Sequence, residues 1–201
     1  MVNVMSHLTI VPATSLRVKD WNDYGELHRV VMSLFNSAQL PGPPAEKRLS
    51  RNILFRVDES TAGKIILIRA DVAPTNLPAA AKTKDVAVGA PAIDTPIRFR
   101  LAVNAIRRTM PSGPTVKRGH GTSPVDHMAE WVAAKLDAGV RDVTIFDHVR
   151  TVASSGRAPL QLDVVDGYGI VRDVAALEVL LQSGIGRSKA FGCGLLTVAR
   201  A

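Results

Sequence analysis

The chain has little cysteine, few aromatic residues and no long apolar run. Its 201 residues include one cysteine, Cys193, which excludes an internal disulfide and is typical of a reducing compartment, so we expect a cytoplasmic location. No apolar run approaches the ~20 residues of a membrane span, and we expect no membrane partner. Residues 1–11 lack a basic region followed by a long apolar stretch, so we expect no signal peptide.

Patterns of metal ligands are missing as well. No two histidines share the spacing of a metal site with a cysteine or carboxylate to complete it; the five are His7, His28, His120, His127 and His148. Cys193 lies in an apolar segment without a basic neighbour that would activate its thiol as a nucleophile. We therefore expect neither a metal nor another cofactor.

Positive charge, in contrast, is in excess. The 25 lysines and arginines outnumber the 18 acidic residues and give a formal charge of +7, which indicates a polyanionic partner. Aromatic residues make up only 4%, whereas proteins that bind single strands by stacking display rings on a sheet surface. Phe55, Phe99 and Phe146 fall in strand-like runs and are interpreted as core residues. We expect nucleic-acid contacts to depend on arginine, lysine and the backbone.

One order of elements occurs twice along the chain. The first half reads as strand, helix, two strands, a short element and a strand, at residues 7–11, 22–36, 51–57, 64–70, 76–81 and 85–88. The second half reads as strand, helix, two strands, helix and strand, at residues 97–106, 124–138, 142–152, 160–165, 174–181 and 195–198, with Ser123 as a helix cap. This is the split βαβ, or ferredoxin-like, order. The sequence therefore predicts an α+β fold of two tandem ferredoxin-like (RRM-like) domains with antiparallel sheets, at residues 1–92 and 93–201.

A glycine-rich loop lies near the C-terminus, between the last helix and the last strand. Its four glycines are Gly184, Gly186, Gly192 and Gly194. Such a loop can turn N–H groups toward an anion, and Arg187 and Lys189 would add positive charge. Dinucleotide-binding and Walker loops, however, run from strand into helix, and this loop runs from helix into strand. The residues alone therefore favour a glycine-terminated helix with a tight return to a sheet over a ligand site.

The first predicted helix carries a histidine at the rim of its apolar face. His28 lies beside that face, Tyr24 lies four residues earlier on the same side, and Arg29 follows directly. A histidine and a tyrosine near cations could transfer protons at a phosphate without a metal. The residue types alone favour the simpler interpretation, a surface histidine stacked on a tyrosine.

Basic residues are concentrated where the second half begins. Arg98 and Arg100 share one face of the predicted strand, because side chains alternate with a period of two. Arg107 and Arg108 follow, and Lys117 and Arg118 lie in the next loop. An exposed basic sheet edge or groove explains this pattern, and so do ordinary solvated arginines.

The glycine-rich loop also carries a family resemblance. Residues 181–186, Lys189 and residues 192–196 closely resemble the C-terminal loop of the CRISPR repeat-processing endoribonucleases of the CasE family. The similarity extends to residues 54–59, 83–86, 96–101 with Asn104, and 167–181, so it covers most of the chain in order. The loop is the specific part of the match, and the other segments support it.

The resemblance implies the same pair of ferredoxin-like domains and a defined reaction. A family member is a metal-independent endoribonuclease that cuts CRISPR precursor RNA at the base of the repeat hairpin. The RNA 2′-hydroxyl attacks the adjacent phosphate, which leaves a 5′-hydroxyl and a 2′,3′-cyclic (or 3′) phosphate. The mature crRNA stays bound, and the other Cascade subunits are the protein partners.

The resemblance also implies roles for particular residues. The catalytic histidine of the family lies in the first helix, where His28 is the one histidine. The tyrosine and lysine of the family motif fall at Gly25 and Ser33, so Tyr24, Arg29 or a distant cation would have to take their place. The RNA would contact the glycine-rich loop and the residues Arg98, Arg100, Arg107, Arg108, Lys117, Arg118, Arg187 and Lys189.

Two alternatives stay open at this point. The displaced tyrosine and the missing lysine are compatible with a catalytically weak RNA-binding subunit of the same complex. The glycine-rich loop is compatible with a small nucleotide-binding enzyme, which would bind a mononucleotide and show no preference for a hairpin.

Overall fold

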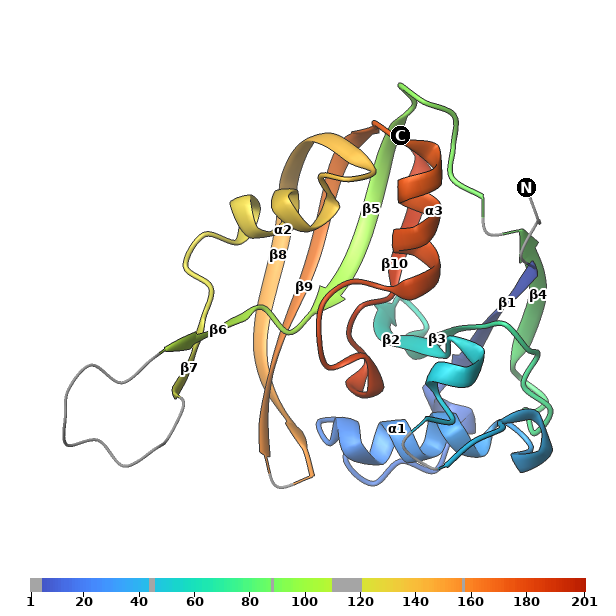
Figure 1. Cartoon of the computed structure of the whole chain (residues 1–201). Coiled ribbons are helices and arrows are strands. Elements are labelled where there is room, and N and C mark those ends of the chain that lie inside the picture. Colours follow the sequence, from blue (N-terminus) through green and yellow to red (C-terminus); the bar gives the residue numbers. More distant parts are fainter. Residues whose placement is uncertain (1–4, 44–45, 88, 110–120, 157) are drawn as a thin grey trace.

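The computed structural model describes residues 5–43, 46–87, 89–109, 121–156 and 158–201 (Figure 1). Two four-stranded antiparallel sheets form its centre, with strand orders β2-β3-β1-β4 and β10-β5-β9-β8. Both orders are those of a ferredoxin-like domain, so the predicted fold is confirmed. The first sheet uses strands between residues 5 and 87, and the second uses strands between residues 96 and 200. The domain boundary near residue 92 stays a prediction.

The first half contains one α-helix rather than the two of a complete ferredoxin-like unit. Its elements are β1 (Met5–Pro12), α1 (Tyr24–Ser33), β2 (Leu54–Ser60), β3 (Gly63–Ala70) and β4 (Lys82–Ala87). Residues 71–81, where the second helix would lie, form turns instead. The single helix covers one face of the sheet, and the other face is left for contacts with the second half.

The second half has both helices and an additional hairpin. Its elements are β5 (Pro96–Val103), α2 (Met128–Leu136), β8 (Val140–Ser155), β9 (Ala158–Val171), α3 (Val174–Ser183) and β10 (Leu196–Arg200), with β6 (Ile106–Thr109) and β7 (Gly121–Pro124) between β5 and α2. The predicted helix start at Ser123 and Pro124 is wrong. These residues pair with Arg107 and Ile106 in the additional hairpin, and α2 begins four residues later.

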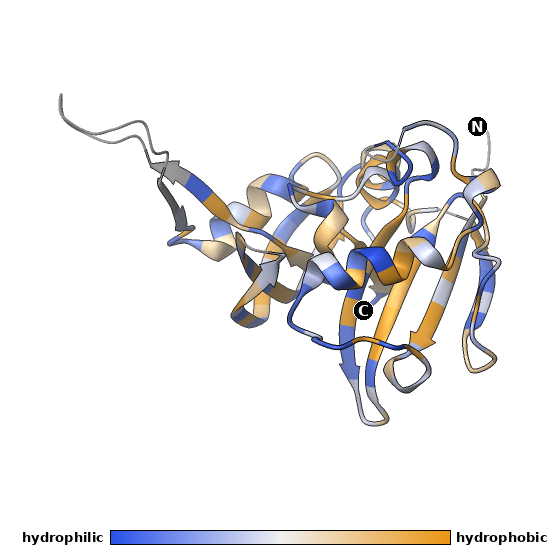
Figure 2. Ribbon diagram, turned by 90° about the horizontal axis from the view of Figure 1, so that it is seen from below, coloured by the Kyte–Doolittle hydropathy of each residue, from blue (hydrophilic) through white to orange (hydrophobic). Residues whose placement is uncertain are grey.

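Apolar residues on one face of α1 attach it to the first sheet. Leu27 and Val31 are fully buried against Phe55, Ile66 and Ile68. Burying a side chain such as Leu27 stabilises the fold by ~1.5–3 kcal/mol. Asp23 caps the helix by accepting a hydrogen bond from the Gly25 N–H at 2.8 Å. Figure 2 shows hydrophobic residues along the strands and on parts of the helices, and the β6–β7 hairpin projecting from the body.

The long β8–β9 hairpin connects the two halves. It extends beyond the second sheet as far as the start of α1 (Figure 1). Near its tip the Ser154 N–H donates to the Asn22 carbonyl at 2.9 Å, and the Gly156 N–H donates to the Asp23 carboxylate at 3.1 Å. Leu160 and Leu162 of β9 join the core under α1. The first core therefore depends on residues from the second half of the chain.

A buried arginine joins the two sheets. Arg56 on β2 is 3% exposed and donates to the carbonyls of Arg100 and Leu195, both at 3.0 Å. Its guanidinium also binds Asp58 at 2.7 Å, and Arg100 lies 3.8 Å from the same carboxylate. These contacts fix the first sheet, on the face that α1 leaves uncovered, against the start of β10.

Candidate active site

His28 lies between α1 and the glycine-rich loop. Its ring meets the edge of Phe191, which belongs to the short 3-10 helix Lys189–Phe191, with centroids 6.3 Å apart and an interplanar angle of 66°. The side chain is half-buried, and within the described part of the chain its buried Nδ1 has no hydrogen-bond partner. Because Nδ1 is buried, proton exchange with a bound substrate would have to use the other ring nitrogen, Nε2.

The surroundings of His28 favour its neutral form. Burial lowers the pKa of the ring below its ordinary value of 6.5, and the positive charges of Arg48 and Arg29 lower the pKa further. A weaker interaction with the Ala190 backbone acts in the opposite direction. At neutral pH the ring is therefore uncharged and surrounded by cations.

The sequence analysis missed one of these cations, Arg48. It lies just before a short 3-10 helix, Leu49–Arg51, and its guanidinium donates to the Ile53 carbonyl at 3.0 Å. Burial lowers its pKa. Arg48 lies 20 residues from His28 in the sequence, in a loop without a recognisable motif, and no signal in the sequence connects the two.

Lys189 adds a further positive charge to this region. Its ammonium donates to the Ser183 carbonyl at 2.7 Å, which ties the middle of the glycine-rich loop to the last residue of α3. Burial and the charge of Arg48 lower its pKa. Lys189 and Arg48 thus approach each other without an intervening carboxylate among the described ion pairs, an arrangement that would attract an anion.

Tyr24 does not form the expected pair with His28. It is 7% exposed and belongs to the core under α1. Burial raises the pKa of its hydroxyl well above its ordinary value, so the group stays protonated. Among the described residues Phe191 is the aromatic neighbour of His28, while the Tyr24 ring packs in the core beside Gly192.

Gly192 shows why the loop lies so close to α1. Its φ is +72°, and a Cβ at this position would lie 2.7 Å from the Tyr24 ring. At the other side of the loop the Ile185 N–H donates to the Gly194 carbonyl at 2.9 Å, and the Gly194 N–H donates to Ala102 at 2.7 Å. The expected glycine-terminated helix with a tight return to the sheet is confirmed, and these two N–H groups are used inside the protein.

Arg98 and Arg100 lie on a sheet face, not on a sheet edge, because β5 is an inner strand. Arg98 is exposed, and its guanidinium lies 5.0 Å from the centroid of the Phe146 ring. Arg100 donates two hydrogen bonds to Asp166, at 2.8 and 2.9 Å, which raise its pKa. The observed contacts of Arg100 hold the sheets together, and an RNA contact for it stays a prediction.

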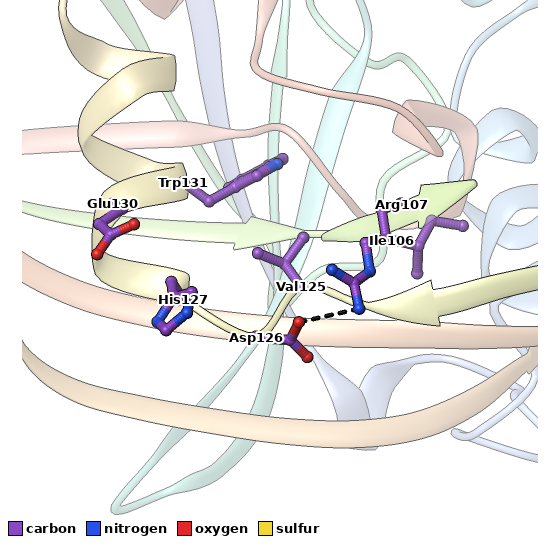
Figure 3. Close-up of a pocket in the computed structure, with 7 residues that line it drawn as sticks. All are labelled: Ile106, Arg107, Val125, Asp126, His127, Glu130 and Trp131. Atoms are coloured by element: carbon purple, nitrogen blue, oxygen red, sulfur yellow. Dashed lines mark ion pairs between the residues drawn. The ribbon is translucent and has the colours of Figure 1, made fainter. Parts of the chain in front are cut away.

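The additional hairpin carries Arg107 at its base. Arg107 pairs with Asp126 at 3.0 Å on the rim of a cavity of about 410 Å³ whose wall includes Trp131 of α2 (Figure 3). Arg187 of the glycine-rich loop lines a neighbouring hollow on the other side of Trp131. Arg108 lies in β6, while Lys117 and Arg118 fall outside the described residues. The hairpin base and the loop thus flank α2.

The described residues form neither a metal-binding cluster nor a membrane-spanning helix. No three histidine, cysteine, aspartate or glutamate side chains in the described ranges gather so that they could hold a metal ion. Within the same ranges no helix is both long and apolar enough to cross a bilayer.

The known proteins that this chain resembles belong to one group. The model of a family described as CRISPR associated protein matches residues 4–200. The CRISPR system Cascade subunit CasE of Escherichia coli K12 is 29% identical over 194 residues, which cover 88% of this chain and 92% of that protein. The crystal structure of Cas6e from E. coli K-12 is 26% identical with a TM-score of 0.68, over 98% of this chain and 99% of that one.

A solved complex with RNA shares the fold. Thermus thermophilus Cse3 bound to an RNA representing a pre-cleavage complex is 20% identical with a TM-score of 0.71, over 97% of this chain and 98% of that one. The family match spans nearly the whole chain, and both sheets align with the same relatives. The chain therefore belongs to the CRISPR-associated protein family of CasE, as its glycine-rich loop predicted.

Proposed function

We propose that this protein is a metal-independent endoribonuclease that cuts CRISPR precursor RNA at the base of each repeat hairpin. It then keeps the mature crRNA as a subunit of Cascade. The observation that carries the proposal is the position of His28, a neutral and partly accessible imidazole whose pKa is lowered by the nearby Arg48 and Arg29. The names of the relatives support the same activity, since structures with this fold include a CRISPR endoribonuclease bound to RNA.

The proposed reaction needs two proton transfers and a positive environment. A base takes the proton of the 2′-hydroxyl, the oxygen attacks the adjacent phosphorus, and the bond to the 5′ oxygen breaks as an acid protonates that oxygen. The products are a 2′,3′-cyclic phosphate and a 5′-hydroxyl. His28 is one of the two proton-transfer groups, and Arg48 and Arg29 stabilise the charge that gathers on the phosphate oxygens. We assign Tyr24 no contact with the scissile phosphate, because its side chain is buried.

The RNA stem would be held by the basic residues around α2. Arg107 and Arg108 at the hairpin base lie on one side, and Arg187 and Lys189 in the glycine-rich loop lie on the other. Lys117 and Arg118 belong to the same proposed contact. Because the contacts are mostly to phosphates, affinity for the RNA should fall steeply as salt concentration rises.

One observation favours the alternative, an RNA-binding subunit with weak catalysis. Burial of Tyr24 and the presence of Ser33 at the lysine position leave His28 as the one proton-transfer group identified among the described residues near the loop. In that case the basic surface would bind the hairpin, and cutting would be slow or absent.

The deciding experiment uses a labelled repeat hairpin from the same genome in excess EDTA. A parallel substrate carries one 2′-deoxy sugar immediately 5′ of the cut. We expect a single cut that the deoxy sugar abolishes, and a loss of about 10²–10⁴ in single-turnover rate for His28→Ala with unchanged hairpin affinity. Tight binding without any cut would contradict the nuclease and support the alternative. Absence of both binding and cutting would contradict both.

A further inference from the structure

An exposed aromatic cluster lies on the face of the second sheet that the helices leave open. Phe146 on β8 and Tyr168 on β9 are 46% and 45% exposed, with ring centroids 4.8 Å apart and an interplanar angle of 35°. The Arg98 guanidinium on β5 lies 5.0 Å from the centroid of the Phe146 ring. The expectation that Phe146 is a core residue is therefore wrong.

Strand pairing explains why these three side chains meet. Ile97 and Phe99 of β5 and Val165 of β9 point into the core under α2 and α3, so their neighbours Arg98 and Asp166 point to the opposite face. Arg98 is paired with Tyr168, and Tyr168 with Thr144, across three adjacent strands.

Phe146 follows the regular alternation of β8. Thr144 is paired with Tyr168 on the open face, Ile145 packs on the core, and Phe146 returns to the face of Thr144. A β-bulge follows: the register shifts between Ile145 and Asp147, so Phe146 is the additional residue on β8 and has no partner on β9. A solvent-exposed ring of this size has a large apolar area in water, which is costly unless something covers it.

We propose that Arg98, Phe146 and Tyr168 form a stacking platform for the single-stranded RNA that flanks the hairpin. Two neighbouring rings and a guanidinium plane offer flat faces to successive bases, which is how ferredoxin-like sheets bind single strands. The positive charge supports RNA as the occupant: in the described part of the chain no carboxylate pairs with Arg98, so its charge is free to meet a phosphate or stack on a base. This inference rests on the proposed function only for the identity of the RNA.

The platform is separate from the proposed cutting site. His28 belongs to α1 and meets the glycine-rich loop, whereas the three platform residues belong to β5, β8 and β9. A strand continuing from the hairpin would therefore gain affinity at a second surface. Contacts at that surface would not change the rate or the position of the cut.

The test measures RNA affinity with and without the flank. The probes are the 2′-deoxy hairpin alone, the same hairpin with a single-stranded flank of about ten nucleotides on either side, and the flank alone. Phe146→Ala and Tyr168→Ala should each weaken binding of the flanked hairpin by about 5- to 150-fold, as expected for loss of one base–aromatic stack. Both variants should bind the flankless 2′-deoxy hairpin, and cut the same hairpin with its 2′-hydroxyl present, like the unsubstituted protein, which also shows that they fold.

Two further variants separate stacking from apolar contact. Phe146→Leu keeps apolar area but has no ring, so it should lose most of the flank-dependent affinity. Val179→Ala, at a 60% exposed position of α3, should lose none. The proposal is overturned if the flank adds no affinity, or if the ring variants keep it; the cluster would then be a surface for a protein partner. Failure to bind the flankless hairpin would instead contradict the proposed function. The platform would still be tested in that case, because binding of the flank alone does not require the hairpin.

Discussion

At the scale of single residues, burial decides which side chains of α1 can take part in chemistry. Tyr24 and His28 lie one helical turn apart, yet Tyr24 is 7% exposed and His28 is half-buried at the loop. Burial raises the pKa of the tyrosine and lowers that of the histidine, so at neutral pH both are uncharged. Tyr24 is closed off in the core, whereas His28 stays partly accessible beside the loop.

The lowered pKa of His28 can be measured directly. We expect its NMR titration midpoint to lie below 6.5, because burial and the charges of Arg48 and Arg29 disfavour the protonated ring. Arg48→Gln should raise the midpoint toward 6.5. Since the unfolded chain takes up this proton more readily than the folded one, the associated stability is present above pH 6.5 and lost as the pH falls through the folded pKa. A midpoint at or above 6.5 would contradict the described surroundings.

Alanine substitutions at two glycines of the loop distinguish the free-energy cost of backbone strain from that of steric contact. Gly186→Ala should lose about 1–2 kcal/mol of unfolding free energy, because φ is +76° and the nearest atom to a new Cβ is 3.8 Å away. Gly192→Ala has a similar φ and meets the Tyr24 ring as well, so it should lose about 1–3 kcal/mol more. Urea denaturation measures both. Equal losses would show that the loop can move away from α1.

At the scale of elements, the β8–β9 hairpin of the second half contacts the start of α1 in the first half. The predicted strands at residues 142–152 and 160–165 are shorter than the observed β8 and β9, which continue to Ser155 and begin at Ala158. Their outer ends leave the second sheet and contact α1 through Asn22 and Asp23. The helix that carries His28 is thereby fixed at its N-terminal end (Figure 1).

Replacing the helix cap of α1 should therefore cost more than replacing an ordinary cap. Asp173 caps α3 by accepting from the Ala176 N–H at 2.9 Å, and Asp173→Ala should lose about 1 kcal/mol. Asp23 accepts from Gly25 and also from Gly156 of the hairpin, so Asp23→Ala should lower Tm further and increase hydrogen exchange at the hairpin tip. If the two variants behave alike, the hairpin contributes nothing to holding α1.

At the scale of the whole molecule, the two sheets depend on buried charge for their arrangement. Arg56 is 3% exposed and satisfies two carbonyls and Asp58, while Arg100 binds Asp166 beside it. Removing one member of such a network leaves the other groups buried without partners. The relative position of α1 and the glycine-rich loop, and so the site itself, depends on this contact.

Arg56→Ala should lose about 3–5 kcal/mol of unfolding free energy, because it leaves the carbonyls of Arg100 and Leu195 and the Asp58 carboxylate unpaired. Arg172→Ala, which breaks an exposed pair with Asp137, should lose less than about 1 kcal/mol. Guanidinium denaturation monitored from both halves provides the comparison. A loss for Arg56→Ala as small as that of the control would mean that the sheets are held together by their apolar contacts alone.

The sequence by itself determined the repeated order of strands and helices, the position of His28 in the first helix and the family. These follow from local periodicity and from one short glycine-rich motif, and both are properties of neighbouring residues. Only the tertiary structure decided the burial of Tyr24, the approach of Arg48 to His28 and the exposure of Phe146. Each depends on which distant segments pack together: Gly192 against Tyr24, the loop before β2 against α1, and α2 and α3 against the face of the second sheet opposite Phe146. No local pattern records contacts between residues so far apart in the chain.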